Sequence, residues 1–146
     1  MDKLEFAPVI DVTSNPKLTS LSQLGSLRTT SFITIQNNAE LLSLQGLDQL
    51  QTVKADIALY NNPKLTSLRG LESLRTVVGK ISIHGHAGLT SLQGLNQIPS
   101  VGGLDFNDNA KLTSLSGQHV HPASDRKTDQ RKLIYPIRYS LQISHA

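Results

Sequence analysis

The residue types needed for catalysis occur in this chain, but their spacing is wrong for an active site. Ser82, His84 and Asp105 match a nucleophilic triad by type, yet Ser82 and His84 are two residues apart in one expected strand, about 6.7 Å. An open sheet also supplies no pocket and no oxyanion donors. Asp11 and Asp105 are expected about 19 Å apart, whereas paired glycosidase carboxylates lie at most about 9.5 Å apart. The sequence therefore predicts a protein that is not an enzyme.

Two histidine pairs are candidates for metal ligation. His84-Gly85-His86 and His119-Val120-His121 can each place two imidazoles on one face of a strand. Neither pair has a carboxylate or a third histidine associated with it, and a zinc site needs three or four protein ligands. The chain has no cysteine, and its doublet Gly102-Gly103 is followed by neither a Lys-Ser/Thr step nor a helix, as a phosphate-binding loop requires. We therefore expect no metal and no cofactor.

The net charge of +3 arises in the C-terminal part of the chain. Residues 1–117 contain nine basic and nine acidic side chains, whereas residues 118–146 contain five and two. Nucleic-acid binding uses basic side chains gathered on one ordered surface, usually with aromatic side chains for stacking, and only 4% of this chain is aromatic. The sequence thus predicts no nucleic-acid partner. No apolar run approaches the about 18 residues of a membrane helix, so membrane insertion is not expected.

A repeat of 23 or 24 residues organises the chain from Val9 to Gly117. Its most regular element is the tetrad Leu-Thr-Ser-Leu, which begins at Leu18, Leu65, Leu89 and Leu112, with Leu-Leu-Ser-Leu at Leu41. Eight residues before each tetrad lies an apolar-x-apolar step: Ile10/Val12, Ile33/Ile35, Ile57/Leu59, Ile81/Ile83 and Leu104/Phe106. One such unit buries too few aliphatic side chains to offset its ordering entropy. The five units, the last incomplete, must stack as the coils of a solenoid, with short parallel strands about 4.8 Å apart.

One polar position recurs at the corner that follows each strand. Five residues after the first apolar strand position stand Asn15, Asn38, Asn62, His86 and Asn109. An inward-turned Asn donates with its amide and accepts with its carbonyl oxygen, and so satisfies backbone groups of a tight corner. We predict a structural asparagine ladder here rather than a ligand site. Because imidazole is a poorer match for the amide, local widening is expected at His86.

This pattern resembles leucine-rich repeats, specifically those of the receptor L domains of growth-factor and insulin receptors and of fungal cell-wall proteins. The resemblance is carried by Leu65-Thr66-Ser67-Leu68-Arg69-Gly70-Leu71, by Leu89-Thr90-Ser91-Leu92-Gln93-Gly94-Leu95 and by Val101-Gly102-Gly103. It implies a mainly all-β fold, a right-handed solenoid with short parallel strands and five coils of 23–24 residues. It also implies recognition of a protein or glycan on the sheet face, and an extracellular or cell-surface location. The chain as written shows no signal peptide, so if complete it would be cytoplasmic.

The outward-facing strand positions form the predicted recognition surface. They make two columns, Asp11/Thr34/Ala58/Ser82/Asp105 and Thr13/Gln36/Tyr60/His84/Asn107. Within these columns we assign the ligand-binding face to Gln36, Tyr60, Ser82, His84, Asp105 and Asn107. Tyr60 is the expected anchor, since Tyr is enriched among the residues that dominate binding interfaces. The predicted function is a non-catalytic binding or adhesion module that recognises a protein or glycan.

Two alternative functions are compatible with the same repeat. One is a purely structural repeat of the cell surface or cell wall. The other is ice binding by a column of threonines on the outer turns, Thr19, Thr66, Thr90 and Thr113, which Leu42 interrupts.

Two regions are expected in the chain. Residues 1–117 form the leucine-rich-repeat solenoid, and residues 118–146 form a basic C-terminal tail. Within the tail, residues 132–144 alternate apolar and polar side chains like a strand. Because a solenoid needs its terminal coils covered, we favour an irregular cap formed by this tail; the alternative is unrelated sequence with no role in the solenoid.

Overall fold

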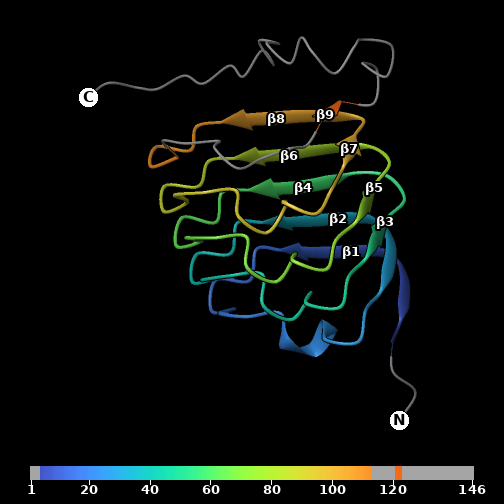
Figure 1. Ribbon diagram of the computed structural model, residues 1–146. Helices are drawn as coiled ribbons and strands as arrows, with labels where there is room; N and C mark the ends of the chain where they lie inside the picture. The colour runs from blue at the N-terminus through green and yellow to red at the C-terminus, as the bar shows by residue number, and fades with distance from the viewer. Residues whose placement is uncertain (1–3, 113–120, 123–146) are drawn as a thin grey trace, which may run out of the picture.

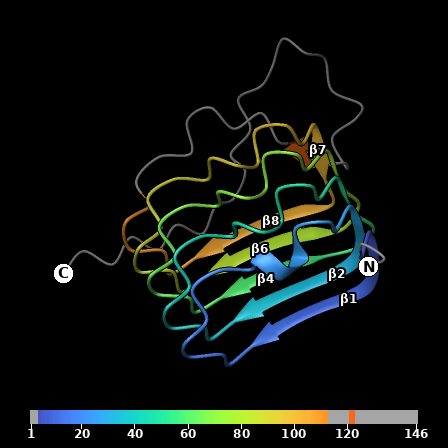
Figure 2. The same ribbon diagram turned by 90° about the horizontal axis from the view of Figure 1, so that it is seen from below.

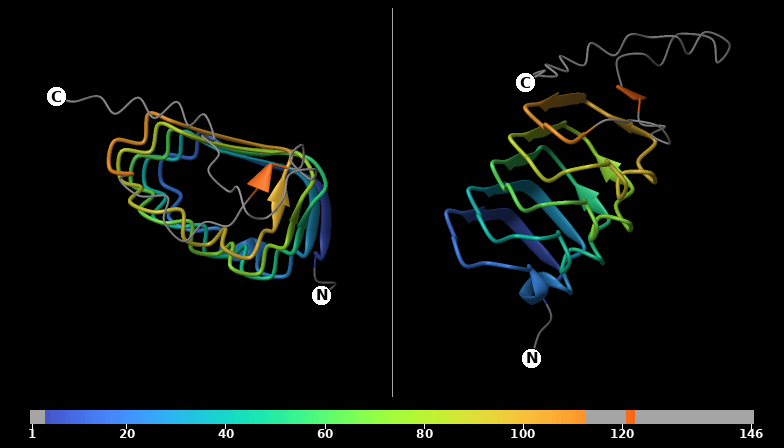
Figure 3. Two further views of the ribbon diagram at one scale, coloured as in Figure 1. Left: turned by 45° about the horizontal axis from the view of Figure 1, so that its top comes forward. Right: turned by 90° about the vertical axis from the view of Figure 1, so that its left-hand side faces the viewer.

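Residues 4–112 and 121–122 are described by the structure, a computed structural model of the 146-residue chain. They form a β-solenoid of about four turns, in which parallel strands are stacked along its length (Figure 1, and Figure 3, right). Its elements are β1 (Phe6–Thr13), η1 (Ser22–Leu24), β2 (Thr29–Gln36), β3 (Thr52–Val53), β4 (Ile57–Tyr60), β5 (Thr76–Val77), β6 (Lys80–His84), β7 (Ser100–Val101), β8 (Gly103–Asn107) and β9 (His121–Pro122). The single 3-10 turn η1 is the only helical element of the described residues. The predicted mainly all-β solenoid is confirmed.

Each coil contributes to two columns of strands that meet at a corner. The long column contains β1, β2, β4, β6 and β8, and neighbours are parallel throughout. The short strands β3 and β5 stack in turn on the first half of β2. The 23- and 24-residue spacings differ at this corner, because two residues separate Thr30 from Ile33 but three separate Val53 from Ile57. β3 and β4 are separate strands where β2 runs through, and β7 and β8 are also separate although they have the shorter spacing.

The tetrad leucines fill the interior in one continuous file. The side chains of Leu41, Leu65 and Leu89 are fully buried, Leu112 is 4% exposed, and Leu18 of the first coil is partly buried. The same turn precedes each of them: the leucine N–H donates to the carbonyl of the ladder residue three positions earlier, at Asn15, Asn38, Asn62, His86 and Asn109. Each coil therefore depends on its neighbours for burial, as expected for a one-dimensional repeat array.

A glycine allows the coils to approach closely at one further position. Gly46, Gly70 and Gly94 have φ between +113° and +117°. A Cβ at Gly70 would lie 2.1 Å from the carbonyl oxygen of Leu44 in the coil below. The first coil has Gln23 at this position and forms the turn η1 there, because no described coil lies beneath it to require a glycine.

Two described residues beyond position 117 pair with the solenoid. β9 pairs in parallel with β7, with His121 opposite Ser100 and Pro122 opposite Val101. Residues 121–122 therefore occupy the place of a further coil. Apart from residues 121–122, the C-terminal tail 118–146, for which an irregular cap is predicted, lies outside the described residues.

Candidate functional site

Strand register aligns the predicted ligand-binding residues across four neighbouring strands. Gln36 of β2 pairs with Tyr60 of β4, Tyr60 pairs with His84 of β6, and His84 pairs with Asn107 of β8. The adjoining column also keeps its register, running Asp11, Thr34, Ala58, Ser82, Asp105. Figure 2 shows these strands side by side as one continuous sheet. The structure thus brings together all six residues that the sequence assigned to the binding face.

Tyr60 and His84 form the aromatic centre of this face. Their ring centroids lie 5.2 Å apart with an interplanar angle of 89°, an edge-to-face arrangement. Both side chains are half-buried. Because the two rings stand on adjacent hydrogen-bonded strands, they are held more rigidly than side chains on a loop, and this lowers the entropic cost of binding a ligand.

Asp105 is the polar centre of the face. Its Oδ2 lies 3.3 Å from Lys80 Nζ and 3.5 Å from His84 Nε2, and its Oδ1 accepts a hydrogen bond of 2.6 Å from Asn107 Nδ2. The His84 Nε2 atom is buried and makes no hydrogen bond to the described residues. Lys80 is the charged partner that compensates the Asp105 carboxylate.

Ser82 contributes little to the accessible face. Its side chain belongs to the predicted column but is only 8% exposed. This short side chain lies between Ala58 and Asp105 on the two neighbouring strands, and it offers little surface to a ligand. Lys80, which the sequence analysis did not assign to the face, reaches Asp105 instead.

A ladder of hydrogen bonds links the predicted asparagine positions, with His86 standing in place of one asparagine. Asn38 Oδ1 accepts the N–H of Asn15 at 3.0 Å, and Asn62 Oδ1 accepts that of Asn38 at 3.0 Å. Asn38 Nδ2 also donates to the carbonyl of Val12, and Asn62 Nδ2 to that of Ile35. Asn38, Asn62 and Asn109 therefore each satisfy one N–H and one carbonyl of the preceding coil, which supports the structural assignment.

His86 replaces both functions of the amide. Its Nε2 lies 3.1 Å from the carbonyl oxygen of Leu59, and because a carbonyl only accepts, Nε2 carries the proton in this contact. Nδ1 lies 3.3 Å from the Asn62 nitrogen and 3.2 Å from the Asn62 carbonyl oxygen. In the neutral ring with its proton on Nε2, Nδ1 accepts the Asn62 N–H. The contact is longer than the 3.0 Å of the Asn positions, but β4 and β6 remain in continuous register. Imidazole can serve this ladder position because its two nitrogens match the amide donor and acceptor.

A second corner position was missed in the sequence. Ser14, Asn37, Asn61 and Asp108 have φ between +50° and +57°, and Gly85 at the same position has φ +72°. Gly, Asn and Asp, which occupy four of these five positions, are residue types that tolerate the left-handed region. The signal was available in the sequence, because each stands directly before a ladder residue. Asn61 Nδ2 donates to Asn37 Oδ1 at 3.4 Å, which extends the polar surface beside Tyr60.

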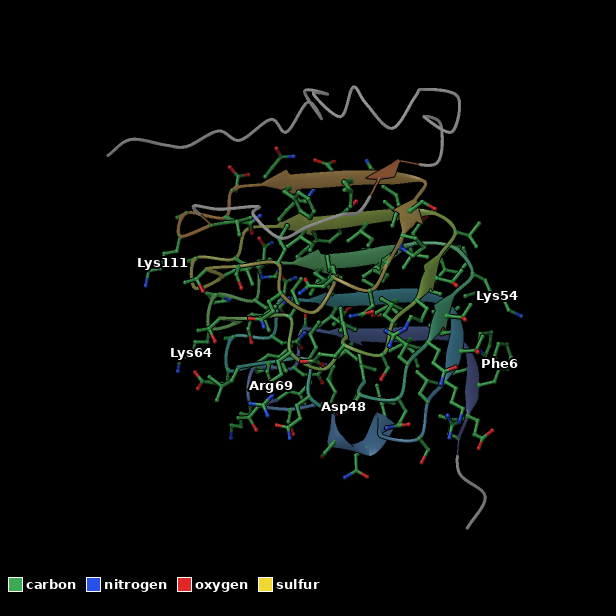
Figure 4. The ribbon with its side chains drawn as sticks, in the orientation of Figure 1. Phe6, Asp48, Lys54, Lys64, Arg69 and Lys111 are labelled. Atoms are coloured by element: carbon green, nitrogen blue, oxygen red, sulfur yellow. The ribbon has the colours of Figure 1, made fainter. Side chains whose placement is uncertain are left out.

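The remaining charges lie away from the aromatic centre. In Figure 4, Lys64, Arg69 and Lys111 project from the side of the turns, and Phe6 and Lys54 lie at the opposite corner. Lys54 Nζ stands 5.5 Å from the centroid of the Phe6 ring. Within residues 4–112 and 121–122, no group of three or more His, Asp and Glu side chains is placed to hold a metal ion. The face is thus a polar and aromatic surface with one compensated carboxylate.

Comparisons with protein-family models, with curated proteins and with solved structures give no match to this chain. In the described part of the chain, no helix has both the length and the apolar character needed to cross a bilayer. The class established by the fold is a parallel β-solenoid of repeated coils.

Proposed function

We propose that this solenoid is a non-catalytic recognition module, related to the receptor L-domain class of leucine-rich repeats, that binds a protein or glycan on the outward face of the long strand column. The observation that carries the proposal is the continuous column Gln36, Tyr60, His84 and Asn107, with Asp105 beside it. Amide, hydroxyl, imidazole and carboxylate groups here alternate with the apolar face of a tyrosine. This combination suits both sugar hydroxyl groups and polypeptide backbone.

Three features support the relation to receptor L domains. The coils are 23–24 residues long, their sheet is parallel, and an asparagine ladder runs along one corner. The resemblance also motivates a cell-surface or extracellular location, which belongs to the same proposal. The size of the surface sets the expected affinity: five strands at about 4.8 Å span only about 24 Å. Such a face supplies less than the about 800 Å² per partner of a standard interface, so weak binding is expected.

A glycan array and a protein pulldown test the proposal directly. The wild-type chain is compared with the double variant Tyr60→Ala/His84→Ala, which removes the aromatic pair without changing a buried leucine. A matched control is Thr66→Ala/Thr90→Ala, which removes two exposed side chains from the outer turns. We expect ligand binding by the wild type and the control, and loss of binding by the double variant. Equal binding by all three would remove the proposed site.

The two alternatives predict different outcomes. A purely structural repeat would show no specific ligand in either assay. For ice binding, the supporting observation is that the outer turns stack regularly, with Thr66 N–H donating to Leu42 O and Thr90 N–H to Thr66 O, both at 3.4 Å. Leu42 is 53% exposed within that column, which interrupts the threonine array. Thermal hysteresis of the purified protein would favour ice binding over the recognition module.

A further inference from the structure

The first coil presents a free sheet edge beside an apolar pocket. β1 pairs with β2 and with no other strand of the described residues. Below it lies a pocket of about 240 Å³ whose lining includes Val12, Leu18, Leu21 and Leu24. Leu18 is partly buried, whereas its counterparts in later coils are fully buried. Figure 3 (right) shows β1 at this open end of the stack. The pocket is therefore the interior of the solenoid where the next coil would pack.

Within the described residues, the Asn15 side chain makes no hydrogen bond to a preceding coil, unlike the side chains of the other ladder residues. In the coils above, the ladder side chain reaches the preceding coil, as Asn38 Nδ2 does to the carbonyl of Val12. Asn15 Nδ2 instead donates to Thr13 O of its own strand, at 3.1 Å, and the Asn15 side chain is exposed. Its amide is thus placed to bind the backbone of an extended segment that docks along β1.

Asp11 gives this edge a negative charge without a basic partner. Asp105, four strands away in the same column, is compensated by Lys80. No basic group of the described residues pairs with the Asp11 carboxylate, which accepts only the hydroxyl of Thr13. An opposite charge directly across a strand pair stabilises it, and a like charge destabilises it. The edge therefore favours a segment with a basic residue opposite Asp11.

A second copy of the chain does not fit this requirement. If its last described coil continued the stack in register, Asp105 of that copy would lie beside Asp11. Lys17 and Lys111 each follow a ladder residue by two positions, so these two lysines would also face one another. Both contacts bring like charges together. Charge complementarity thus selects a different polypeptide.

We propose that the edge of β1 binds an extended segment of a partner protein, parallel to β1, with the pattern aliphatic–basic–aliphatic. The basic residue pairs with Asp11, and the two flanking aliphatic side chains pack on Val12, Leu18 and Leu24. In the bound segment, the backbone N–H three residues after the second aliphatic residue donates to Asn15 Oδ1. The carbonyl of that second aliphatic residue accepts a hydrogen bond from Asn15 Nδ2. These are the contacts that Asn38 makes with the first coil. Strand addition of this kind takes its affinity from the backbone and its specificity from alternate side chains.

The test uses a fluorescein-labelled peptide, Ile-Arg-Ile-Thr-Gly-Asn, in a fluorescence anisotropy titration. The comparison peptide, Ile-Asp-Ile-Thr-Gly-Asn, differs only at the residue opposite Asp11. We expect the Arg peptide to bind the wild-type chain about three- to tenfold more tightly than the Asp peptide. The variant Asp11→Lys should reverse this preference, because the charge opposite the peptide has changed sign. Asp11 is exposed, so the variant should fold, and far-UV circular dichroism verifies that it does.

A second variant pair tests the apolar contact. Leu24→Gln should weaken binding of both peptides, whereas Val78→Gln, which changes a 62% exposed side chain outside this pocket, should leave binding unchanged. The variant Tyr60→Ala/His84→Ala should also bind both peptides normally, so failure of the recognition face and failure of this edge are distinguishable. Absence of binding up to millimolar peptide, or an Arg preference that Asp11→Lys leaves unchanged, would overturn the proposal.

Discussion

His86 makes the ladder sensitive to acid at one coil. Its imidazole is fully buried and serves the Asn62 N–H and the Leu59 carbonyl only as the neutral ring with the proton on Nε2. Burial lowers the pKa of His86 below its ordinary value of 6.5, an effect that hydrogen bonds with the Asn62 and Leu59 backbone oppose and the neighbouring His84 reinforces. The folded chain therefore resists protonation of this ring.

The direction of the pH effect follows from this lowered pKa. Below pH 6.5 the unfolded chain takes up a proton at this residue before the folded chain does, so the free energy of unfolding falls as the pH decreases. The stability that the neutral His86 ring contributes is fully present above pH 6.5. It is lost as the pH falls through the pKa of His86 in the folded state. Each tenfold difference in proton affinity between the two states changes the free energy of unfolding by about 1.4 kcal/mol.

Two substitutions separate the hydrogen-bonding role of His86 from its titration. His86→Asn restores the residue found at the other four ladder positions, and we expect a stability within about 1 kcal/mol of wild type at pH 8. His86→Leu leaves the Asn62 N–H and the Leu59 carbonyl buried without their partner. Because each unsatisfied group costs about 1–3 kcal/mol, this variant should lose about 2–6 kcal/mol at the same pH.

Urea denaturation followed by far-UV circular dichroism between pH 8 and pH 4.5 measures these effects. The difference between wild type and His86→Asn isolates His86, because all other titrating groups are shared. We expect the stability of the wild type to fall more steeply below pH 6.5 than that of the Asn variant. The reasoning would be refuted by parallel pH profiles, or by a Leu variant as stable as the Asn variant at pH 8.

Two further predictions concern the coil geometry and the surface charges. Gly70→Ala should destabilise the chain by at least about 2 kcal/mol, because the φ of Gly70 is +113° and a Cβ there would lie 2.1 Å from the carbonyl oxygen of Leu44. The control Gly25→Ala should change stability little, because the φ of Gly25 is −60°. Thermal unfolding measures both variants. Lys64 Nζ lies 2.7 Å from Glu40 Oε2, but both side chains are about half exposed and water screens the ion pair. Lys64→Ala should therefore lower the free energy of unfolding, measured by urea denaturation, by less than about 1 kcal/mol. A larger loss at Lys64, or equal losses for the two glycine variants, would contradict these assignments.

Periodicity made the fold of this chain accessible from its sequence. The tetrad leucines, the alternating strand residues and the ladder positions recur at a nearly constant spacing, and stacking is the arrangement that buries each unit against identical neighbours. Register follows from the same spacing, because slipping by one residue would turn every buried strand side chain outward. Tyr60 and His84 could therefore be placed on adjacent strands before any coordinates were known.

The tertiary structure decided what periodicity does not encode. Ser82 shares the column of Asp11 but is only 8% exposed, and Lys80 reaches Asp105 because the sheet brings β6 and β8 together. The tautomer of His86 depends on the carbonyl of Leu59, 27 residues earlier. Repeat spacing determines which positions are neighbours, since it sets the stacking, whereas burial, proton positions and charge compensation depend on the side chains that meet across coils.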